Sequence, residues 1–184
     1  MLKLVKPVAA AGLMAWTLDG GAVILSLTPD SQTVQVNDAV TLNVIYDTQG
    51  ENPGGGVFAL TFENSAFRLE KVEFDDNLPD DPGFRVSPSL PVTDKTFNLG
   101  FGNANGIQGS GKAISLVFQA LTPGSFEFLL GNPLPPHDPF NKVTGTVTYN
   151  SATVEVQAVP IPAGIGLFAS GLAILGFKSR RNPD

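Results

Sequence analysis

Hydrophobic and polar residues alternate through most of the chain with a period of two. Within residues 40–47, Val40, Leu42, Val44 and Tyr46 occupy every second position. Successive side chains of a β-strand point to opposite faces, so this spacing predicts a strand with one buried face. The same alternation recurs in eight further short segments: 58–62, 67–69, 72–74, 97–101, 114–120, 126–130, 143–149 and 154–158.

Turn-forming clusters rich in Gly, Pro, Asn and Asp separate these segments, at 52–56, 79–83, 103–106 and 122–124. Such clusters supply the backbone conformations that tight turns need, and no segment between them keeps a helical period. The pattern predicts an all-β fold, a two-sheet antiparallel sandwich. Immunoglobulin-like and jelly-roll strand orders both remain open.

The N-terminus differs from this pattern. Lys3 and Lys6 precede an apolar run over 8–16, and small residues stand at Gly20 and Ala22. A positive start, a short apolar stretch and small residues before the cut site are typical of a signal peptide. We expect residues 1–22 to be removed by signal peptidase after Ala22, so that the remainder is exported.

The C-terminus carries a second apolar segment. The motif Val159, Pro160, Ile161, Pro162 and Ala163 leads into the run 164–177, and Lys178, Arg180 and Arg181 follow. Basic residues beside a span resist translocation, which favours a membrane-crossing tail with a cytoplasmic end. As a helix, residues 163–177 would cover about 22 Å, less than the ~30 Å hydrocarbon core. Such a marginal span suits temporary residence; a retained single-pass anchor is the alternative.

This three-part tail over 159–184 resembles the PEP-CTERM sorting signal in its Val-Pro-Leu-Pro-Ala variant. The resemblance implies recognition by an exosortase in the inner membrane of a Gram-negative bacterium. It also implies cleavage near the proline motif and delivery to the cell surface or the extracellular matrix of a biofilm. Ile161 stands where the namesake motif has Glu, which leaves the subtype of the sorting enzyme open.

Residues 23–158 remain between the two address segments, and this length suits one domain with one core. The span holds fifteen acidic and six basic side chains, a formal net charge of −9. An acidic domain repels phosphate backbones, which argues against nucleic acid as a partner. The chain has no cysteine, which excludes disulfides, thiolate nucleophiles and thiolate zinc sites.

The stretches 25–38, 56–62 and 109–124 resemble the cohesin and carbohydrate-binding-module type of sandwich. That resemblance implies a nine-stranded jelly roll used for protein docking or glycan contact. The partner it implies is a dockerin-like protein or a polysaccharide.

Residues that could carry catalysis are scarce. His137 is the single histidine and lies in a proline-rich loop, so a solvated loop side chain is favoured over a zinc site or a catalytic triad. The sequence Gly109-Ser-Gly-Lys112 lacks the first glycine of a phosphate loop and leads into a predicted strand. We predict no catalytic and no cofactor-binding residue.

One acidic cluster has the oxygen-rich composition that calcium prefers: Asp75, Asp76, Asn77, Asp80 and Asp81. Pro79 and Pro82 break EF-hand spacing, so a solvated acidic loop is the favoured interpretation and calcium the alternative.

These patterns together predict an exported, non-enzymatic protein of the cell surface or matrix, with a role in adhesion or biofilm. The loops 75–81 and 103–109 are polar and lie between predicted strands, so we expect them to present the binding surface. The alternative from a different functional class is an exported glycan hydrolase. It stays open because the two carboxylates that such an enzyme needs can be far apart in the sequence and come together only in the fold.

Overall fold

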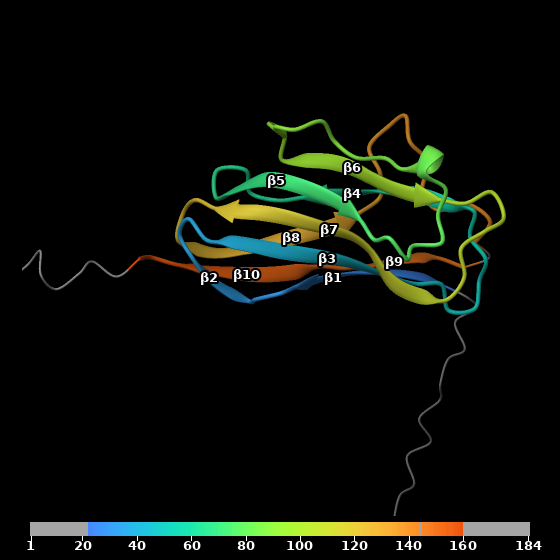
Figure 1. The fold of residues 1–184 in the computed structure, drawn as a ribbon, viewed down its shortest axis with the longest axis horizontal. Helices are drawn as coiled ribbons and strands as arrows, with labels where there is room; N and C mark the ends of the chain where they lie inside the picture. Colours follow the sequence, from blue (N-terminus) through green and yellow to red (C-terminus); the bar gives the residue numbers. More distant parts are fainter. Residues whose placement is uncertain (1–21, 144, 160–184) are drawn as a thin grey trace, which may run out of the picture.

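The computed structural model describes residues 22–143 and 145–159, which form a sandwich of two β-sheets (Figure 1). The strands in this part of the chain are β1 (Val23–Pro29), β2 (Thr33–Gln35), β3 (Ala39–Asp47), β4 (Gly55–Thr61), β5 (Phe67–Phe74), β6 (Thr96–Gly102), β7 (Ser110–Ala120), β8 (Gly124–Gly131), β9 (Val147–Asn150) and β10 (Ala152–Gln157). A short 3₁₀ helix, η1 (Pro82–Phe84), precedes β6. The predicted all-β, two-sheet sandwich is confirmed.

Each sheet has five strands. Sheet A has the order β5-β7-β3-β1-β9, and sheet B has the order β2-β10-β8-β4-β6. Consecutive strands belong to different sheets, so the chain crosses between the layers at every connection. β9 pairs with β1 in parallel, and β10 pairs with β2 in parallel. The other strand pairs are antiparallel, as expected. The described residues hold one strand more than the nine expected from the sequence.

Phenylalanine side chains fill much of the space between the sheets. Phe62, Phe67, Phe118 and Phe128 are almost fully buried and come from both sheets. Their ring centroids lie 4.8 Å apart for Phe67 and Phe128 and 5.2 Å apart for Phe62 and Phe118. Tilted and edge-on aromatic contacts of this kind add to the free energy of apolar burial. The alternation read from the sequence thus places one continuous core between the layers.

Two strand predictions were wrong in detail. Residues 67–69 and 72–74 were expected as separate strands, but both belong to β5, whose pairing with β7 shifts register between Leu69 and Lys71. An extra residue in one strand changes the face to which later side chains point, which explains the broken alternation. Val143 and Gly145 were expected in a strand, yet β9 begins only at Val147.

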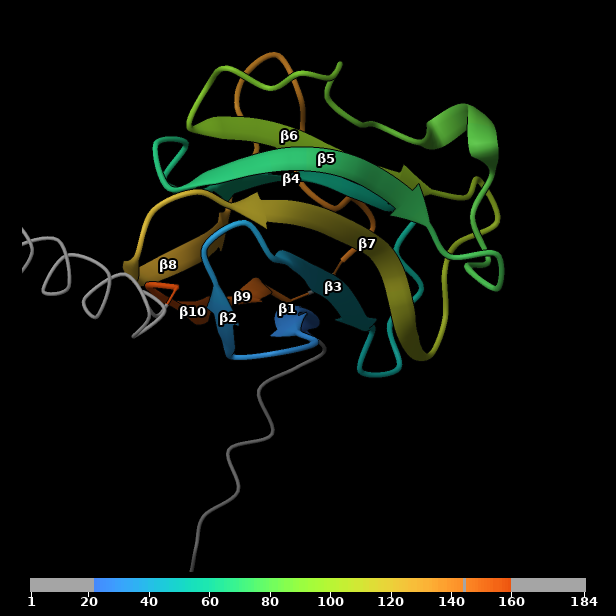
Figure 2. The same cartoon turned by 60° about the vertical axis from the view of Figure 1, so that its left-hand side comes forward.

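The described domain begins and finishes at opposite ends of the sandwich. The start of β1 lies at the right in Figure 1, and the end of β10, two residues before Val159, lies at the left. Figure 2 shows the same arrangement after rotation, with the short green coil of η1 far from β10. We call the end opposite Val159, formed by the segments 75–86 and 103–109, the distal end.

Candidate functional site

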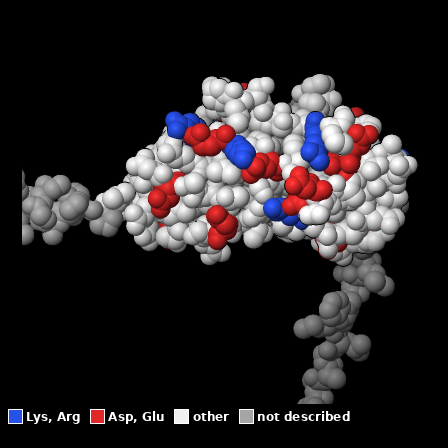
Figure 3. All heavy atoms as spheres, viewed as in Figure 1, with Lys and Arg blue, Asp and Glu red and all other residues white. Residues whose placement is uncertain are grey.

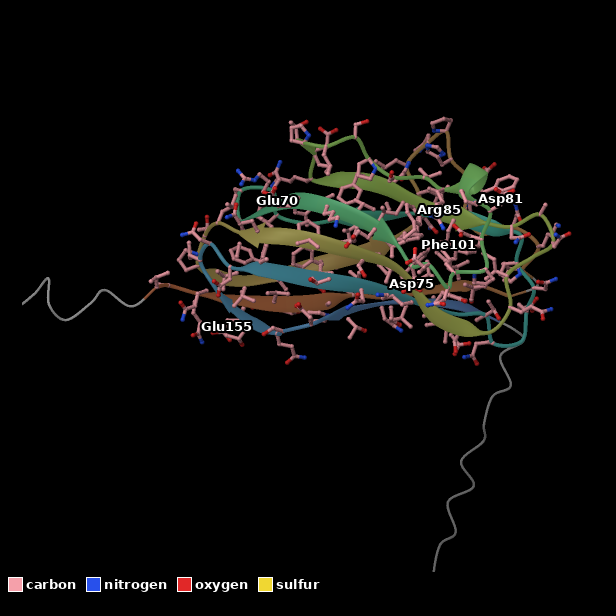
Figure 4. All side chains as sticks on the ribbon, viewed as in Figure 1. Glu70, Asp75, Asp81, Arg85, Phe101 and Glu155 are labelled. Atoms are coloured by element: carbon pink, nitrogen blue, oxygen red, sulfur yellow. The ribbon has the colours of Figure 1, made fainter. Side chains whose placement is uncertain are left out.

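The two loops singled out from the sequence lie together at the distal end. The Asn103 side-chain amide donates a hydrogen bond to the Pro79 carbonyl over 3.1 Å. The backbone N–H of Asp81 donates to the Gly102 carbonyl over 2.8 Å. Figure 4 shows Asp75, Asp81 and Arg85 gathered at this end, far from Glu155. Segments separated by more than twenty residues therefore form one surface.

Asp75 begins the acidic loop and is held from two sides. Its carboxylate accepts a hydrogen bond from the Asn77 backbone N–H at 2.9 Å and forms an ion pair with Lys112 at 3.1 Å. The hydrogen bond from Asn77, followed by the contact with Lys112, lowers the pKa of Asp75 below its usual range. The carboxylate therefore stays charged and fixes the first turn of the loop.

Asp80 and Arg85 fix the second half of the same loop. Arg85 donates from Nε and Nη2 to the two carboxylate oxygens of Asp80 over 2.8 and 2.9 Å. The guanidinium also lies over the Phe74 ring, 4.9 Å from its centroid. The hydrogen bonds to Asp80 raise the pKa of Arg85 above its usual value. A planar two-point contact of this type fixes geometry as well as charge.

Each loop also inserts one apolar side chain into the core. Leu78 is 6% exposed and Ile107 is 1% exposed. The Ile107 backbone N–H donates to the Pro53 carbonyl over 2.8 Å. The two loops were expected to be polar and flexible, but a buried leucine or isoleucine ties each of them to the sandwich.

Three of the four carboxylates that could have bound calcium, those of Asp75, Asp80 and Asp81, have protein partners instead. Asp75 binds Lys112, Asp80 binds Arg85, and Asp81 accepts the Gly83 backbone N–H over 2.9 Å at the start of η1. Within residues 22–143 and 145–159, no group of three or more His, Cys, Asp or Glu side chains is placed to hold a metal ion.

A trough opens beside the distal end on the outer side of sheet B. Its volume is about 410 Å³. Residues 54–57 of β4 and its approach, with Gly102 of β6, form the floor. Residues 83–86 form one wall, and residues 138–142 with Ala104 form the other. We refer to this feature as the trough.

Sequence reasoning did not find the trough. The exposed aromatic residue of the trough, Phe84, lies in a turn outside any alternating segment. The wall formed by residues 138–142 lies in the loop that follows β8. The one available signal was the group of glycines at 54–56 with Gly100 and Gly102, since outward positions without side chains leave a strand pair bare.

The outer face of sheet A is charged but paired internally. Arg68 contacts Glu70 and Lys71 contacts Glu73 along β5, and Figure 3 shows basic and acidic side chains interspersed on this side. Charges on an edge strand discourage pairing with another sheet. The β5 edge of sheet A is thus protected from pairing with another sheet.

The remaining chemical candidates from the sequence have ordinary surroundings. His137 is exposed in the loop between β8 and β9, as expected. Ser110, in the segment that superficially resembles a phosphate loop, begins strand β7, so no helix N-terminus follows it. Neither position brings catalytic groups together.

The predicted address segments fall almost wholly outside the described residues. Ala22 is the first residue described and Val159 the last, while Pro160, Ile161, Pro162 and Ala163 lie beyond. Lys178, Arg180 and Arg181 also lie outside, as does the expected C-terminal helix. Along the stretches that are described, no helix is long and apolar enough to cross a membrane.

Solved structures of cohesin domains share this fold. The seventh ScaB type I cohesin from Pseudobacteroides cellulosolvens matches with a TM-score of 0.57 and 13% identity, over 77% of this chain and 96% of that chain. The third cohesin of ScaC from Acetivibrio cellulolyticus, in complex with the ScaB dockerin, matches with a TM-score of 0.59 and 11% identity, over 73% and 98%.

A third match is the type I cohesin–dockerin complex Coh-OlpC-Doc435 from Clostridium thermocellum, with a TM-score of 0.58 and 13% identity over 76% of this chain and 94% of that one. No family model and no curated protein sequence matches the chain. The described domain is a two-sheet β-sandwich with the cohesin fold. At these identities the likeness is one of fold.

Proposed function

We propose that this chain is an exported, non-enzymatic binding module of the cell surface or extracellular matrix, and that its distal end binds a protein partner. One observation carries the proposal: the two inter-strand loops join into a single fixed surface at the end opposite Val159. The predicted sorting tail begins at Val159. A domain attached to the surface or matrix at this end presents the distal end outward, where a partner can reach it.

The nature of the partner is inferred from fold neighbours. Two of the cohesin structures with this fold were solved in complex with a dockerin. A dockerin-like protein is therefore the partner class that we propose for this chain. Display of many copies on a surface or in a matrix strengthens weak single contacts, which suits a role in adhesion.

The non-enzymatic character is supported by the residues around the trough. Asp138 is the one acidic side chain among those that line it. Glycoside hydrolysis ordinarily requires two carboxylates that face each other across the bond to be cut. The trough is thus equipped for binding, and the exported hydrolase is the weaker candidate.

The route of export forms part of the proposal. Signal peptidase would cut after Ala22, and an exosortase would act at the motif 159–163 while Lys178, Arg180 and Arg181 hold the end in the cytoplasm. Intact-mass analysis of the native protein, with cell fractionation, tests this route. A mature species that starts at Val23 and lacks Lys178 to Asp184 is expected. A species in the inner membrane that retains those residues would identify a plain anchor.

Partner binding is tested with residues 22–159 displayed densely on beads and exposed to the secretome of the source organism. Asp76→Arg and Asn105→Arg change the tips of the two distal loops, and Glu155→Arg makes a similar charge change near Val159. The proposal predicts a partner, identified by mass spectrometry, that the loop variants lose and Glu155→Arg retains. Retention by all three variants would place the binding surface elsewhere.

A further inference from the structure

The trough beside the distal end has walls that the backbone holds in place. On one side, Asn141 donates its backbone N–H to the Gly55 carbonyl over 3.0 Å, and Val57 donates to the Asp138 carbonyl over 3.2 Å. Phe140, between them, is 7% exposed and packs on Phe101 with a centroid separation of 5.4 Å. This wall is therefore an extension of sheet B beside β4.

The opposite wall is fixed in the same way. Val86 exchanges two hydrogen bonds with Gly100, both at 2.9 Å, and so pairs with the edge of β6. Asp81 caps η1, and the Asp80–Arg85 ion pair ties the same segment to the sandwich. Phe84 is consequently presented at the rim by a turn with several anchors.

The floor between the walls is bare backbone. A Cβ at Gly55 would lie 2.2 Å from the Gly102 Cα, and Gly55 has a φ of +109° that disfavours other residues. A Cβ at Gly102 would lie 2.9 Å from the Gly54 carbonyl oxygen and 3.4 Å from the Phe84 Cβ. Side chains cannot fill the trough from below, so its shape exists before any ligand arrives. Its volume of about 410 Å³ falls within the range of small-molecule sites.

The side chains around the trough define the chemistry of its ligand. Phe84 is 54% exposed and lines one wall with an apolar ring. Asp138, Asn141 and Lys142 line the other wall, where they offer a carboxylate, an amide and an ammonium group. The Asp138 carboxylate has no hydrogen-bond or ion-pair partner among the described residues. One positive and one negative charge leave this wall neutral, and Arg85 on the opposite wall is paired with Asp80.

We propose that the trough binds an uncharged oligosaccharide segment, at a site that shares residues 83–86 and Ala104 with the distal end but does not include the loop tips Asp76 and Asn105. A sugar ring has a face of C–H groups that packs on an aromatic ring and an edge of hydroxyls that donate and accept hydrogen bonds. Phe84 receives the C–H face. Asp138, Asn141 and Lys142 receive the hydroxyls. Polyanionic chains are disfavoured, because the acidic domain repels them.

The test uses the full chain in a detergent without a sugar headgroup, applied to an array of uncharged and anionic glycans and then titrated calorimetrically with the best oligosaccharide. An uncharged threonine–proline hexapeptide provides the peptide arm. Phe84→Ala is expected to weaken saccharide binding by about tenfold or more. Ala104→Trp, which places a large side chain at the trough without removing a polar group, should abolish it.

A matched control is Leu121→Ala, which removes an exposed apolar side chain from the turn between β7 and β8. Saccharide affinity should be unchanged in this variant and in the loop-tip variant Asp76→Arg, while circular dichroism shows that every variant is folded. Three results would each overturn the proposal. The protein could bind none of the uncharged glycans, it could prefer anionic glycans or the peptide, or its saccharide affinity could be unchanged by both Phe84→Ala and Ala104→Trp. Failure of the parent protein to capture any protein partner, with saccharide binding intact, would instead count against the protein-binding surface alone.

Discussion

Asp80 and Arg85 are joined by two hydrogen bonds, and the Asp80 side chain is only 1% exposed while that of Arg85 is 31% exposed. The pair links the acidic loop to the turn that presents Phe84. Charged groups removed from water are stabilising only while both partners remain. The distal end and the trough therefore depend on the same ion pair.

Removal of Asp80 tests this dependence. Asp80→Ala should destabilise the domain by about 1–3 kcal/mol, because it leaves the half-buried guanidinium without its partner. The matched control is Glu73→Ala, which breaks the exposed pair with Lys71 and should cost at most ~0.5 kcal/mol. Urea unfolding of both variants gives the comparison. Equal losses in the free energy of unfolding would show that the buried Asp80–Arg85 pair stabilises the domain no more than the exposed Lys71–Glu73 pair.

The phenylalanine core gives a second prediction. Phe118 is 0% exposed and packs against Phe62 and Phe128, so Phe118→Ala should cost about 3–5 kcal/mol. Phe84→Ala makes the same chemical change at a 54% exposed site and should stay within ~0.5 kcal/mol. Thermal and urea unfolding measure both. A large loss at Phe84 would mean that this ring supports the fold and would weaken its assignment as a binding group.

The sequence predicted the sandwich well because burial with a period of two is a local property. The spacing of Val40, Leu42 and Val44 predicts the inner face of β3 without any knowledge of which strands lie beside it. The bulge in β5 escaped this reasoning, since an extra residue interrupts the alternation in the same way as a strand end. The sheet order depended on long-range pairing, which periodicity does not encode.

The candidate site was only partly predictable for a related reason. The loops 75–81 and 103–109 were visible as polar stretches between strands, but their contact through Asn103 and Pro79 arises from the fold. The trough forms where residues near 55, 84, 102 and 140 meet in the fold. Each of these residues already has an ordinary structural role, so none of them indicates a site when the sequence is read alone. Glycines and a turn phenylalanine are common in any sandwich, so the group of glycines, the one available signal, did not by itself indicate a site.

Backbone crowding at the floor of the trough leads to a third prediction. Gly55→Ala should destabilise the domain by more than ~1 kcal/mol, because the new Cβ meets the Gly102 Cα and the residue has a positive φ. Gly131→Ala is the control: its Cβ would meet nothing within 4 Å, and the change should be neutral or slightly stabilising. The denaturant concentrations at which the two variants are half unfolded give the comparison. A tolerated Gly55→Ala would contradict the close approach of β4 and β6.

A fourth prediction concerns acid. Hydrogen bonds from Lys95 and Ser65 lower the pKa of Glu63 from 4.5 to about 2. A lowered pKa means that the stabilisation is fully present above pH 4.5 and is lost as the pH falls through about 2. Glu63→Gln should therefore have a slightly lower melting temperature than the parent at neutral pH, with the difference shrinking below pH 4.5.

Lys95→Gln provides the control, because it removes the ammonium group that pairs with the Glu63 carboxylate. It should reproduce most of the loss at neutral pH, and the double variant should add little to either change. A difference between Glu63→Gln and the parent that persists unchanged at pH 2 would show that the carboxylate charge is not its source.

The central claim, that the distal end is the binding surface, is tested most directly by hydrogen–deuterium exchange of the domain with and without its captured protein partner. Slower exchange confined to residues 75–86 and 103–109, with the outer face of β5 and β7 unchanged, is the predicted result. Protection across β5 and β7, with the two distal loops unaffected, would contradict the account.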